Sequence, residues 1–216
     1  MTRLKINKQY IKKEFTCIES DKELKKWLEL LNWIDKKIIT FFGWHRVKKD
    51  SIYYKSCKEL AYKLWKKDYA ILSWGWPWIM HASNSWATQV KTISIWTRAE
   101  LLTKERIYDN IFIHTLDFKF LFTRRFIMSV KSEALIFYPW WYWTLNELFE
   151  YAVLIQTGIT DKVPIICVYK DFWKWLFEWL ENNPLREDFL INNISDLDLI
   201  HFIDSEDEII DIIWKY

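Results

Sequence analysis

Apolar positions follow two patterns along the chain: short runs of β-branched and aromatic residues, and longer segments with apolar residues at helical spacing. The short runs predict buried strands, and the longer segments predict amphipathic helices. The predicted strands span residues 38–42, 69–73, 92–95, 111–114, 134–138, 165–169 and 199–203. The predicted helices span residues 20–31, 51–66, 79–90, 118–130, 144–156 and 172–181. Because strands and helices alternate, we expect an α/β fold, a three-layer αβα sandwich around a mostly parallel sheet.

Two serine-glutamate pairs predict where helices begin. Ser20 precedes Glu23 by three residues, and Ser205 precedes Glu208 by the same spacing. In a capping box the serine hydroxyl accepts the backbone N–H of the third helical residue, and the glutamate returns a hydrogen bond to the cap. We therefore expect one helix to open at Ser20 and the last helix of the chain to open at Ser205.

Length and charge limit the class of protein. A chain of 216 residues fits one domain, which we assign to residues 1–216 with an N-terminal helical extension over about residues 1–35. The net charge of +2 gives no argument for a nucleic-acid or membrane partner. No apolar run is long enough to span a membrane, and the N-terminus lacks the apolar segment of a secretory signal. With three scattered cysteines, the sequence predicts a soluble cytoplasmic protein.

The glycine and tryptophan contents are unusual. The chain has 3 Gly and 16 Trp, whereas average usage predicts about fifteen glycines in a chain of this length. The tryptophans gather after the predicted strands, at Gly43-Trp44, at residues 74–78 and at residues 140–143. Tight turns at the carboxyl ends of parallel strands, where ligands bind, normally need glycine. An aromatic cluster or a sugar-binding platform is an alternative, although stacking does not require tryptophan at every turn.

With glycine written for tryptophan, residues 73–80 read SGGGPGIM and residues 139–147 read PGGYGTLNE. These strings closely resemble the two signature motifs of the LOG ("lonely guy") family of nucleoside 5′-monophosphate phosphoribohydrolases, often mislabelled lysine decarboxylases. The segment Phe122-Thr123-Arg124-Arg125 resembles the arginine motif of the family. The resemblance runs from about Ile38 to about Trp179 and implies a Rossmann-like domain.

The resemblance also suggests a hypothesis about the tryptophans. Ten of them fall where relatives carry glycine, at positions 44, 74, 76, 78, 86, 96, 140, 141, 143 and 175, whereas Trp173 falls where an aromatic residue is expected. We therefore expect that the gene reads UGA as glycine and that the sequence was translated with UGA as tryptophan. Trp33, Trp65 and Trp214 stay undecided.

The resemblance assigns the chemistry to one carboxylate and one arginine. It implies Arg124 and Glu147 as catalytic residues, because a carboxylate can stabilise the oxocarbenium-like state of N-glycosidic cleavage and orient or deprotonate water. The alternatives are a surface salt bridge for Arg124 and a capping box between Thr144 and Glu147. The substrate-binding residues that it implies are Gly43, Trp44, Trp74, Gly75, Trp76, Met80, Arg125, Trp140, Trp141, Trp143 and Thr144.

In the glycine reading, backbone N–H groups after Trp140 point from a helix N-terminus toward a phosphate. Met80 lies near the base in relatives, although a Met at a helix start is more often part of the core. The four histidines are dispersed, so we expect no metal and no cofactor.

These residues predict hydrolysis of AMP or a cytokinin riboside monophosphate to free base and ribose 5-phosphate. The resemblance implies a homodimer with helices near the site at its interface, and we expect a small-molecule nucleotide substrate with no nucleic-acid or membrane partner. The alternative is a non-catalytic nucleotide or molybdenum-cofactor carrier of the same superfamily, which does not need the Arg124 and Glu147 pair. A third reading is a family enzyme whose substrate has diverged.

Overall fold

A computed structural model describes residues 13–43, 48–74, 79–85, 93–99, 114–182 and 194–216. Its centre is a seven-stranded sheet with the strand order β4-β3-β2-β1-β5-β6-β7. Every paired strand runs parallel to its neighbour. The strands are β1 (Ile38–Phe42), β2 (Ala70–Trp74), β3 (Ser94–Ala99), β4 (His114–Phe118), β5 (Ser132–Phe137), β6 (Ile165–Val168) and β7 (Ile200–Ile203). The predicted α/β fold with a parallel sheet is confirmed.

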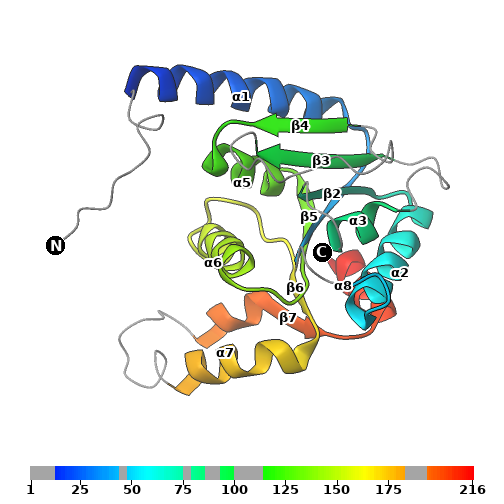
Figure 1. Ribbon diagram of the computed structural model, residues 1–216. Coiled ribbons are helices and arrows are strands. Elements are labelled where there is room, and N and C mark those ends of the chain that lie inside the picture. Colours follow the sequence, from blue (N-terminus) through cyan, green and yellow to red (C-terminus); the bar gives the residue numbers. More distant parts are fainter. Residues whose placement is uncertain (1–12, 44–47, 75–78, 86–92, 100–113, 183–193) are drawn as a thin grey trace.

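Helices cover both faces of this sheet (Figure 1). They are α1 (Lys13–Trp33), α2 (Ile52–Lys66), α3 (Ile79–Asn84), α5 (Leu121–Ser129), α6 (Tyr142–Gln156), α7 (Lys170–Asn182) and α8 (Glu206–Lys215), with a 3-10 helix η2 (Ile194–Leu199) before β7. In Figure 1, α2, α3 and α8 lie on one side of the sheet and α5 and α6 on the other, while α1 runs along the β4 edge. None of the described helices is long and apolar enough to cross a membrane.

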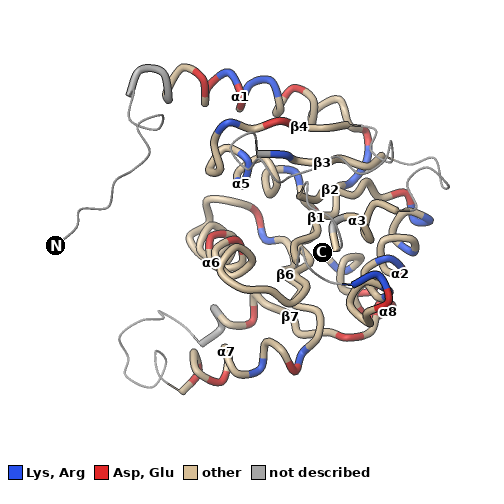
Figure 2. The backbone as a smooth tube through the Cα atoms, in the orientation of Figure 1, with Lys and Arg blue, Asp and Glu red and all other residues tan. Residues whose placement is uncertain are grey.

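The core explains why the central strands read as continuous apolar runs. All five residues of β1 are buried, because helices cover this strand from both faces. Charged residues lie outside this core. Figure 2 shows basic and acidic residues together along α1 and where α2 meets α8, where the Lys63 ammonium lies 2.8 Å from the Asp207 carboxylate. Exposed pairs of this kind add little stability, so the buried apolar faces hold the layers together.

The two predicted capping boxes have opposite outcomes. Ser205 caps α8, and its hydroxyl accepts the Glu208 N–H at 3.5 Å. The prediction at Ser20 is wrong, because α1 already begins at Lys13 and Ser20 lies inside it, donating to the Cys17 carbonyl at 3.1 Å. Glu23 instead reaches across to α5, where the Thr123 hydroxyl donates to its carboxylate at 2.7 Å. A tertiary contact has therefore taken the side chain that the local pattern assigned to a cap.

The remaining differences concern element boundaries. The strand predicted at residues 111–114 shares only His114 with β4, which runs from His114 to Phe118, and residues 111–113 lie outside the described part. Because β4 includes Phe118, helix α5 begins only at Leu121. The β3 strand runs from Ser94 to Ala99 instead of ending at residue 95. The described part of α3 ends at Asn84, and the rest of the helix predicted to residue 90 is not described beyond residue 85.

Candidate functional site

The candidate site lies where the carboxyl ends of β1, β2 and β5 meet the first turns of α6. β2 ends at Trp74, β5 is followed by Tyr138 and Pro139, and α6 begins at Tyr142. Helix α5, on the same side of the sheet as α6, carries Arg124 (Figure 1). In parallel α/β sheets, ligands bind beyond these strand ends. The structure therefore brings the second sequence motif, the arginine motif and the described ends of the first motif to one edge of the sheet.

Two indole rings occupy the centre of this edge. The Arg124 guanidinium carbon lies 3.4 Å from the centre of the Trp74 ring, and the Trp143 ring meets the Trp74 ring edge-on with their centroids 5.5 Å apart. The Trp74 side chain is 5% exposed, and Arg124 is fully buried. A cation over an indole face is a favourable contact, but here it fills the space in front of the arginine with carbon.

The two polar residues predicted on α6 are buried in the same region. Thr144 is fully buried and Glu147 is 2% exposed. Within the described part of the chain, Thr144 Oγ1 and Glu147 Oε1 have no hydrogen-bond partner. Burial raises the pKa of the Glu147 carboxyl well above its ordinary value, although the charges of Arg124 and Arg125 and the nearby indole N–H of Trp74 oppose this shift. A buried oxygen without a partner costs free energy, so these two atoms point to a group that binds there.

The capping-box alternative for these residues is wrong. Helix α6 begins at Tyr142, with Trp141 at its N-cap position and no side-chain hydrogen bond at the cap. Thr144 and Glu147 therefore lie inside the helix, three residues apart on its buried face. The first N–H groups of α6 receive no bond from the cap side chain, which leaves the positive end of the helix open to an anion.

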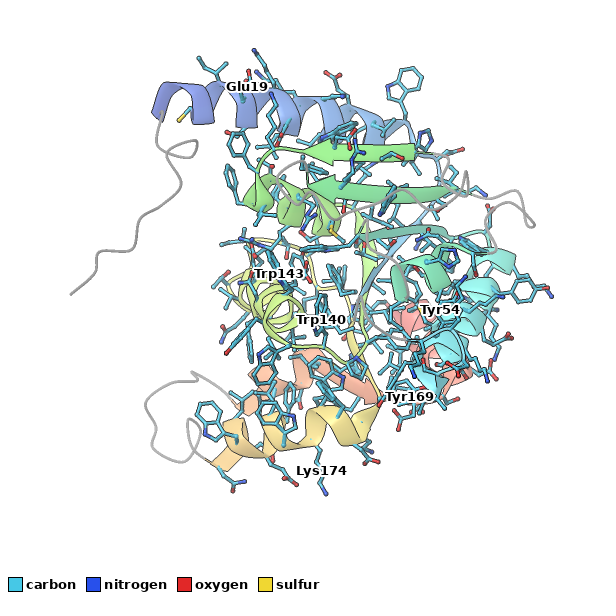
Figure 3. All side chains as sticks on the ribbon, in the orientation of Figure 1. Glu19, Tyr54, Trp140, Trp143, Tyr169 and Lys174 are labelled. Atoms are coloured by element: carbon cyan, nitrogen blue, oxygen red, sulfur yellow. The ribbon has the colours of Figure 1, made fainter. Side chains whose placement is uncertain are left out.

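The segment that leads into α6 carries three more of the predicted binding residues. Trp140 is half-buried, Trp141 is exposed, and Trp143 packs against the core. Figure 3 shows the Trp140 and Trp143 side chains at the start of α6, facing the middle of the molecule. Large side chains thus surround the helix terminus that the glycine reading leaves bare.

Gly43 follows β1 and lies against β5. A Cβ atom built on Gly43 would come within 2.8 Å of the Tyr138 Cβ and 3.0 Å of the Ile79 Cγ2. No side chain fits at that distance, so the close approach of β1, β5 and α3 requires glycine here. Of the other predicted binding residues, Trp44, Gly75 and Trp76 lie outside the described residues, as does the side chain of Met80.

Arg125, the last predicted binding residue, faces a different direction from Arg124. Its Nε donates to Glu150 of α6 in an ion pair, and the Tyr151 hydroxyl donates to its carbonyl at 2.9 Å. Arg125 also lines an open depression of about 700 Å³ between α5 and α6, together with Tyr142, Leu145, Asn146, Phe149, Glu150, Val153 and Leu154. Arg124 therefore lies on the buried side of α5, whereas the half-buried Arg125 lies toward α6 and the depression.

The described tryptophans differ in how the structure accommodates the indole N–H. Trp173 is 0% exposed and donates to the Val168 carbonyl at 2.9 Å, and Trp27 donates to the Asp117 carbonyl at 3.2 Å. The indole N–H groups of Trp65 and Trp74 are buried without a partner in the described structure. Buried Trp normally finds an acceptor. Trp27 and Trp173 thus occupy sites built for tryptophan, and Trp74 does not.

A comparison with protein families agrees with the second motif and with the arginine motif, which both lie inside the matched residues. Residues 80–213, more than half of the chain, match the family described as possible lysine decarboxylase. The chain belongs to this family. The match confirms the resemblance to the LOG family, whose members often carry that label, and it includes Arg124 and Glu147. No curated protein matches the chain.

Solved structures share the fold of this LOG-family domain. The structural-genomics protein TM1055 has a TM-score of 0.61 at 15% identity, over 83% of this chain and 99% of its own. The molybdenum cofactor binding protein of Rippkaea orientalis has a TM-score of 0.62 at 16% identity, over 84% of this chain and 98% of its own. The molybdenum cofactor carrier protein of Chlamydomonas reinhardtii has a TM-score of 0.59 at 16% identity, over 83% and 97%. At identities this low, the similarity shows a shared fold and does not indicate a shared function.

The structure adds polar residues that sequence reasoning missed. Asn84 of α3 donates to the Ser73 hydroxyl at 2.6 Å and accepts from Ser94, which ties α3 to β2 and β3. Ser56 and Glu206 lie near Tyr138, at the end of β5. Their spacing of 150 residues leaves no local pattern that could have indicated this contact. Among the described residues, no group of His, Cys, Asp and Glu could hold a metal ion.

Proposed function

We propose that this protein hydrolyses the N-glycosidic bond of purine nucleoside 5′-monophosphates, AMP or a cytokinin riboside monophosphate, and that the ten tryptophans at motif positions are glycine in the native protein. The observation that carries the proposal is the pair of buried α6 oxygens, Thr144 Oγ1 and Glu147 Oε1, which lack partners in the described structure. In this glycine form the Trp74 and Trp143 rings are absent, and a substrate can reach both oxygens.

The reaction needs stabilisation of positive charge on the sugar. As the bond between C1′ and the base nitrogen breaks, the electron pair leaves with the base and the ribose becomes oxocarbenium-like. The Glu147 carboxylate stabilises this charge and accepts a proton from the water that attacks C1′. The leaving base takes up a proton from the solvent, Glu147 later returns the proton of the attacking water to the solvent, and the products are free base and ribose 5-phosphate.

The negative end of the substrate needs a different partner. The 5′-phosphate binds at the N-terminus of α6, where backbone N–H groups and the helix dipole favour an anion. The Thr144 hydroxyl, which has no acceptor or donor partner in the described structure, donates to the phosphate. Arg124, opposite Glu147, anchors the ribose phosphate and balances the charge of the substrate.

The codon assignment has its own support and its own test. Trp74 lacks a partner for its indole N–H in the described structure, whereas Trp173 donates at 2.9 Å. We expect UGA codons at the ten positions and a UGG codon at Trp173. Peptide mass spectrometry of the native protein gives an independent reading, since glycine at these positions makes each peptide lighter. UGG codons at the ten positions contradict the proposal.

The activity test uses the glycine form, made from a gene with glycine codons at the ten positions. We expect it to release adenine from AMP, and we expect Glu147→Gln and Arg124→Ala to abolish release while AMP still binds to the first variant. Lys131→Gln, on the exposed turn after α5, is the matched control and keeps full activity. A molybdenum-cofactor or nucleotide carrier of this fold binds without releasing base, so tight AMP binding with no adenine favours that alternative.

We further propose that the protein is a homodimer that joins through α5 and α6. Phe122, Phe126, Tyr142, Phe149 and Val153 are exposed apolar side chains on these two helices. Exposed apolar side chains gathered on two neighbouring helices are typical of an interaction surface. Light scattering on the glycine form should give twice the chain mass, and Val153→Asp should give the monomer. A monomeric parent protein contradicts this proposal.

The reducing cytoplasm is the proposed compartment. All three cysteines are free, and burial raises the pKa of the Cys57 and Cys167 thiols well above the ordinary value. Thiols of this kind are inert in a reducing compartment. Fractionation of the native cells, with an antibody to the protein, tests the assignment.

A further inference from the structure

A row of three hydrogen-bonded side chains lies behind the loop that leads into α6. It joins Tyr138, at the end of β5, to Ser56 of α2 and to Glu206 at the start of α8. We propose that Ser56 and Glu206 are positioning residues, which hold the phosphate-binding loop at residues 139–143 in place through Tyr138. This inference rests on the proposed function, because it assigns a task to the loop that binds the phosphate.

The geometry fixes Tyr138 at both its backbone and its ring. Tyr138 is fully buried, and its N–H donates to the Phe42 carbonyl at 2.9 Å. Its hydroxyl lies 3.2 Å from Ser56 Oγ, and Ser56 Oγ lies 2.9 Å from Glu206 Oε1. The distance between Ser56 and Glu206 is ordinary for an O–H···O hydrogen bond and that between Tyr138 and Ser56 is longer, so a continuous row with a weaker first bond runs from the loop to α8.

The chemistry of the three groups sets the direction of each bond. An ionised carboxylate can only accept, so the single proton of the Ser56 hydroxyl goes to Glu206. Tyr138 must then donate to Ser56, whose lone pairs remain free to accept. Burial raises the pKa of the Tyr138 phenol well above its ordinary value, which keeps it a donor. Hydrogen bonds that end on a charged acceptor are stronger than neutral ones.

Tyr138 is also packed closely against its neighbours. The Cα of Gly43 comes so close that a Cβ there would lie 2.8 Å from the Tyr138 Cβ. The Tyr169 ring lies on another side with a centroid distance of 6.2 Å, and Phe41 stacks at 6.5 Å. In Figure 3, Tyr54 and Tyr169 lie on the α2 side of the sheet, across from Trp140 and Trp143. The row therefore crosses the molecule behind the site.

Tyr138 can transmit its position to the loop because of the residue that follows. Pro139 is buried, and its ring fixes the backbone φ angle. The direction in which the chain enters residues 140–143 therefore depends on the backbone of Tyr138. A small rotation of this residue moves every N–H group of the loop relative to the phosphate, and misplaced donors lose much of their effect.

The test measures equilibrium binding of AMP and steady-state hydrolysis for variants of the glycine form. Tyr138→Phe, Ser56→Ala and Glu206→Gln should each raise the Kd and KM for AMP about three- to tenfold, with kcat within about twofold. The double variant Tyr138→Phe with Glu206→Gln should match the worse single variant, because one row is broken in both. Ser56→Thr keeps the hydroxyl and should restore the parent KM.

Glu208→Gln is the matched control, since it removes the same charge from an exposed position in the same turn of α8. It should leave the Kd and KM unchanged. Parent-like binding in Glu206→Gln and Ser56→Ala, or effects that add fully in the double variant, would overturn the inference. A parent glycine form that binds no AMP contradicts the proposed function itself, whereas binding without hydrolysis leaves the effect of the row on Kd measurable.

Discussion

Trp74 and Trp173 are both buried indoles near the carboxyl end of a strand, and their surroundings differ in kind. Trp173 donates its N–H to the Val168 carbonyl at 2.9 Å and packs edge-on against Phe172 with a centroid distance of 5.0 Å. Trp74 lies under the Arg124 guanidinium, and its buried N–H has no partner in the described structure. The surroundings of Trp173 thus provide an acceptor for its indole N–H, and the described surroundings of Trp74 do not.

The difference teaches how to separate a structural tryptophan from one that fills a ligand site. Around Trp173 the indole supplies both the volume and the hydrogen bond that its neighbours require. Around Trp74 the ring covers Arg124 and adjoins Trp143, in the region where Thr144 and Glu147 have oxygens without partners in the described structure. Removal of the Trp74 ring would therefore open space beside the buried polar groups on α6, whereas removal of the Trp173 ring would take a hydrogen bond from the end of β6.

The largest expected effect is at Trp173. Trp173→Gly in the glycine form should lower the free energy of unfolding by about 3–5 kcal/mol, because it leaves a large cavity and an unpaired carbonyl. Urea denaturation followed by circular dichroism measures this change. Trp27→Gly, which removes the donor to the Asp117 carbonyl, should have an effect in the same direction.

The exposed Trp179 of α7 provides the control for this substitution. Its side chain is 54% exposed, so Trp179→Gly costs mainly the helix propensity of glycine, about 1 kcal/mol. A free energy of unfolding for Trp173→Gly equal to that of Trp179→Gly would show that the buried indole is not required, and the contrast with Trp74 would disappear.

The next effect is at the site itself. Restoring tryptophan at position 74 or 143 of the glycine form should weaken AMP binding by about tenfold to a hundredfold, because an added ring costs about 1–3 kcal/mol of overpacking with substrate bound. Isothermal titration with AMP measures the loss. Restoring tryptophan at position 175 is the control, since that side chain is half exposed on α7. Equal losses at positions 74 and 175 contradict the assignment of the site.

Substitution of Glu147 should have a smaller, pH-dependent effect on the melting temperature, and this effect should differ between the tryptophan form and the glycine form. In the form with tryptophan at all ten positions, burial raises the pKa of Glu147 above its ordinary value of 4.5. The folded protein then keeps a proton that the unfolded chain releases, so stability falls as the pH rises above this value, until the folded-state pKa is reached. Glu147→Gln should therefore raise the melting temperature at about pH 7 and leave it unchanged below about pH 4.

Water and substrate can reach Glu147 in the glycine form, so its pKa should be less raised and the effect of Glu147→Gln on the melting temperature at neutral pH should shrink. Thermal melts across pH measure this effect when they are recorded for the tryptophan form and the glycine form, each with and without Glu147→Gln. An identical pH dependence in the two forms would show that the indoles do not control the environment of this carboxyl group.

The sequence was sufficient where periodicity and local motifs determine structure. The β1 strand at Ile38–Phe42, the helix after Ser51 and the cap at Ser205 follow from patterns a few residues long. The family motifs led to Arg124 and Glu147, which the structure buries at one edge of the sheet. Ser20 was predicted wrongly because Glu23 bonds to residues a hundred positions away in the sequence.

Long-range contacts explain most of what the sequence could not indicate. Ser56 meets Glu206 across 150 residues, and Arg125 pairs with Glu150 across the gap between two helices. Neither contact follows from local spacing. The bounds of β4 were missed because residues 111–114 are the more apolar segment, whereas His114–Phe118 includes Thr115 and Asp117 and is identified as a strand by its pairing with β3.

The smallest effects are at the tryptophans that the motifs leave undecided. Trp33 ends α1 and is 85% exposed, so Trp33→Gly should change the free energy of unfolding by less than about 0.5 kcal/mol. Trp214 lies in α8 under the Lys67 ammonium, 3.8 Å from the ring centre, and Trp214→Gly should cost about 1–2 kcal/mol through the lost cation contact and glycine in the helix. Urea denaturation at two salt concentrations separates these terms, because only the cation contact weakens with salt. If Trp33→Gly lowered the free energy of unfolding as much as Trp214→Gly, the contacts of the two side chains would not determine the cost of removing them. Stability measurements could then not help to decide whether either position is tryptophan or glycine.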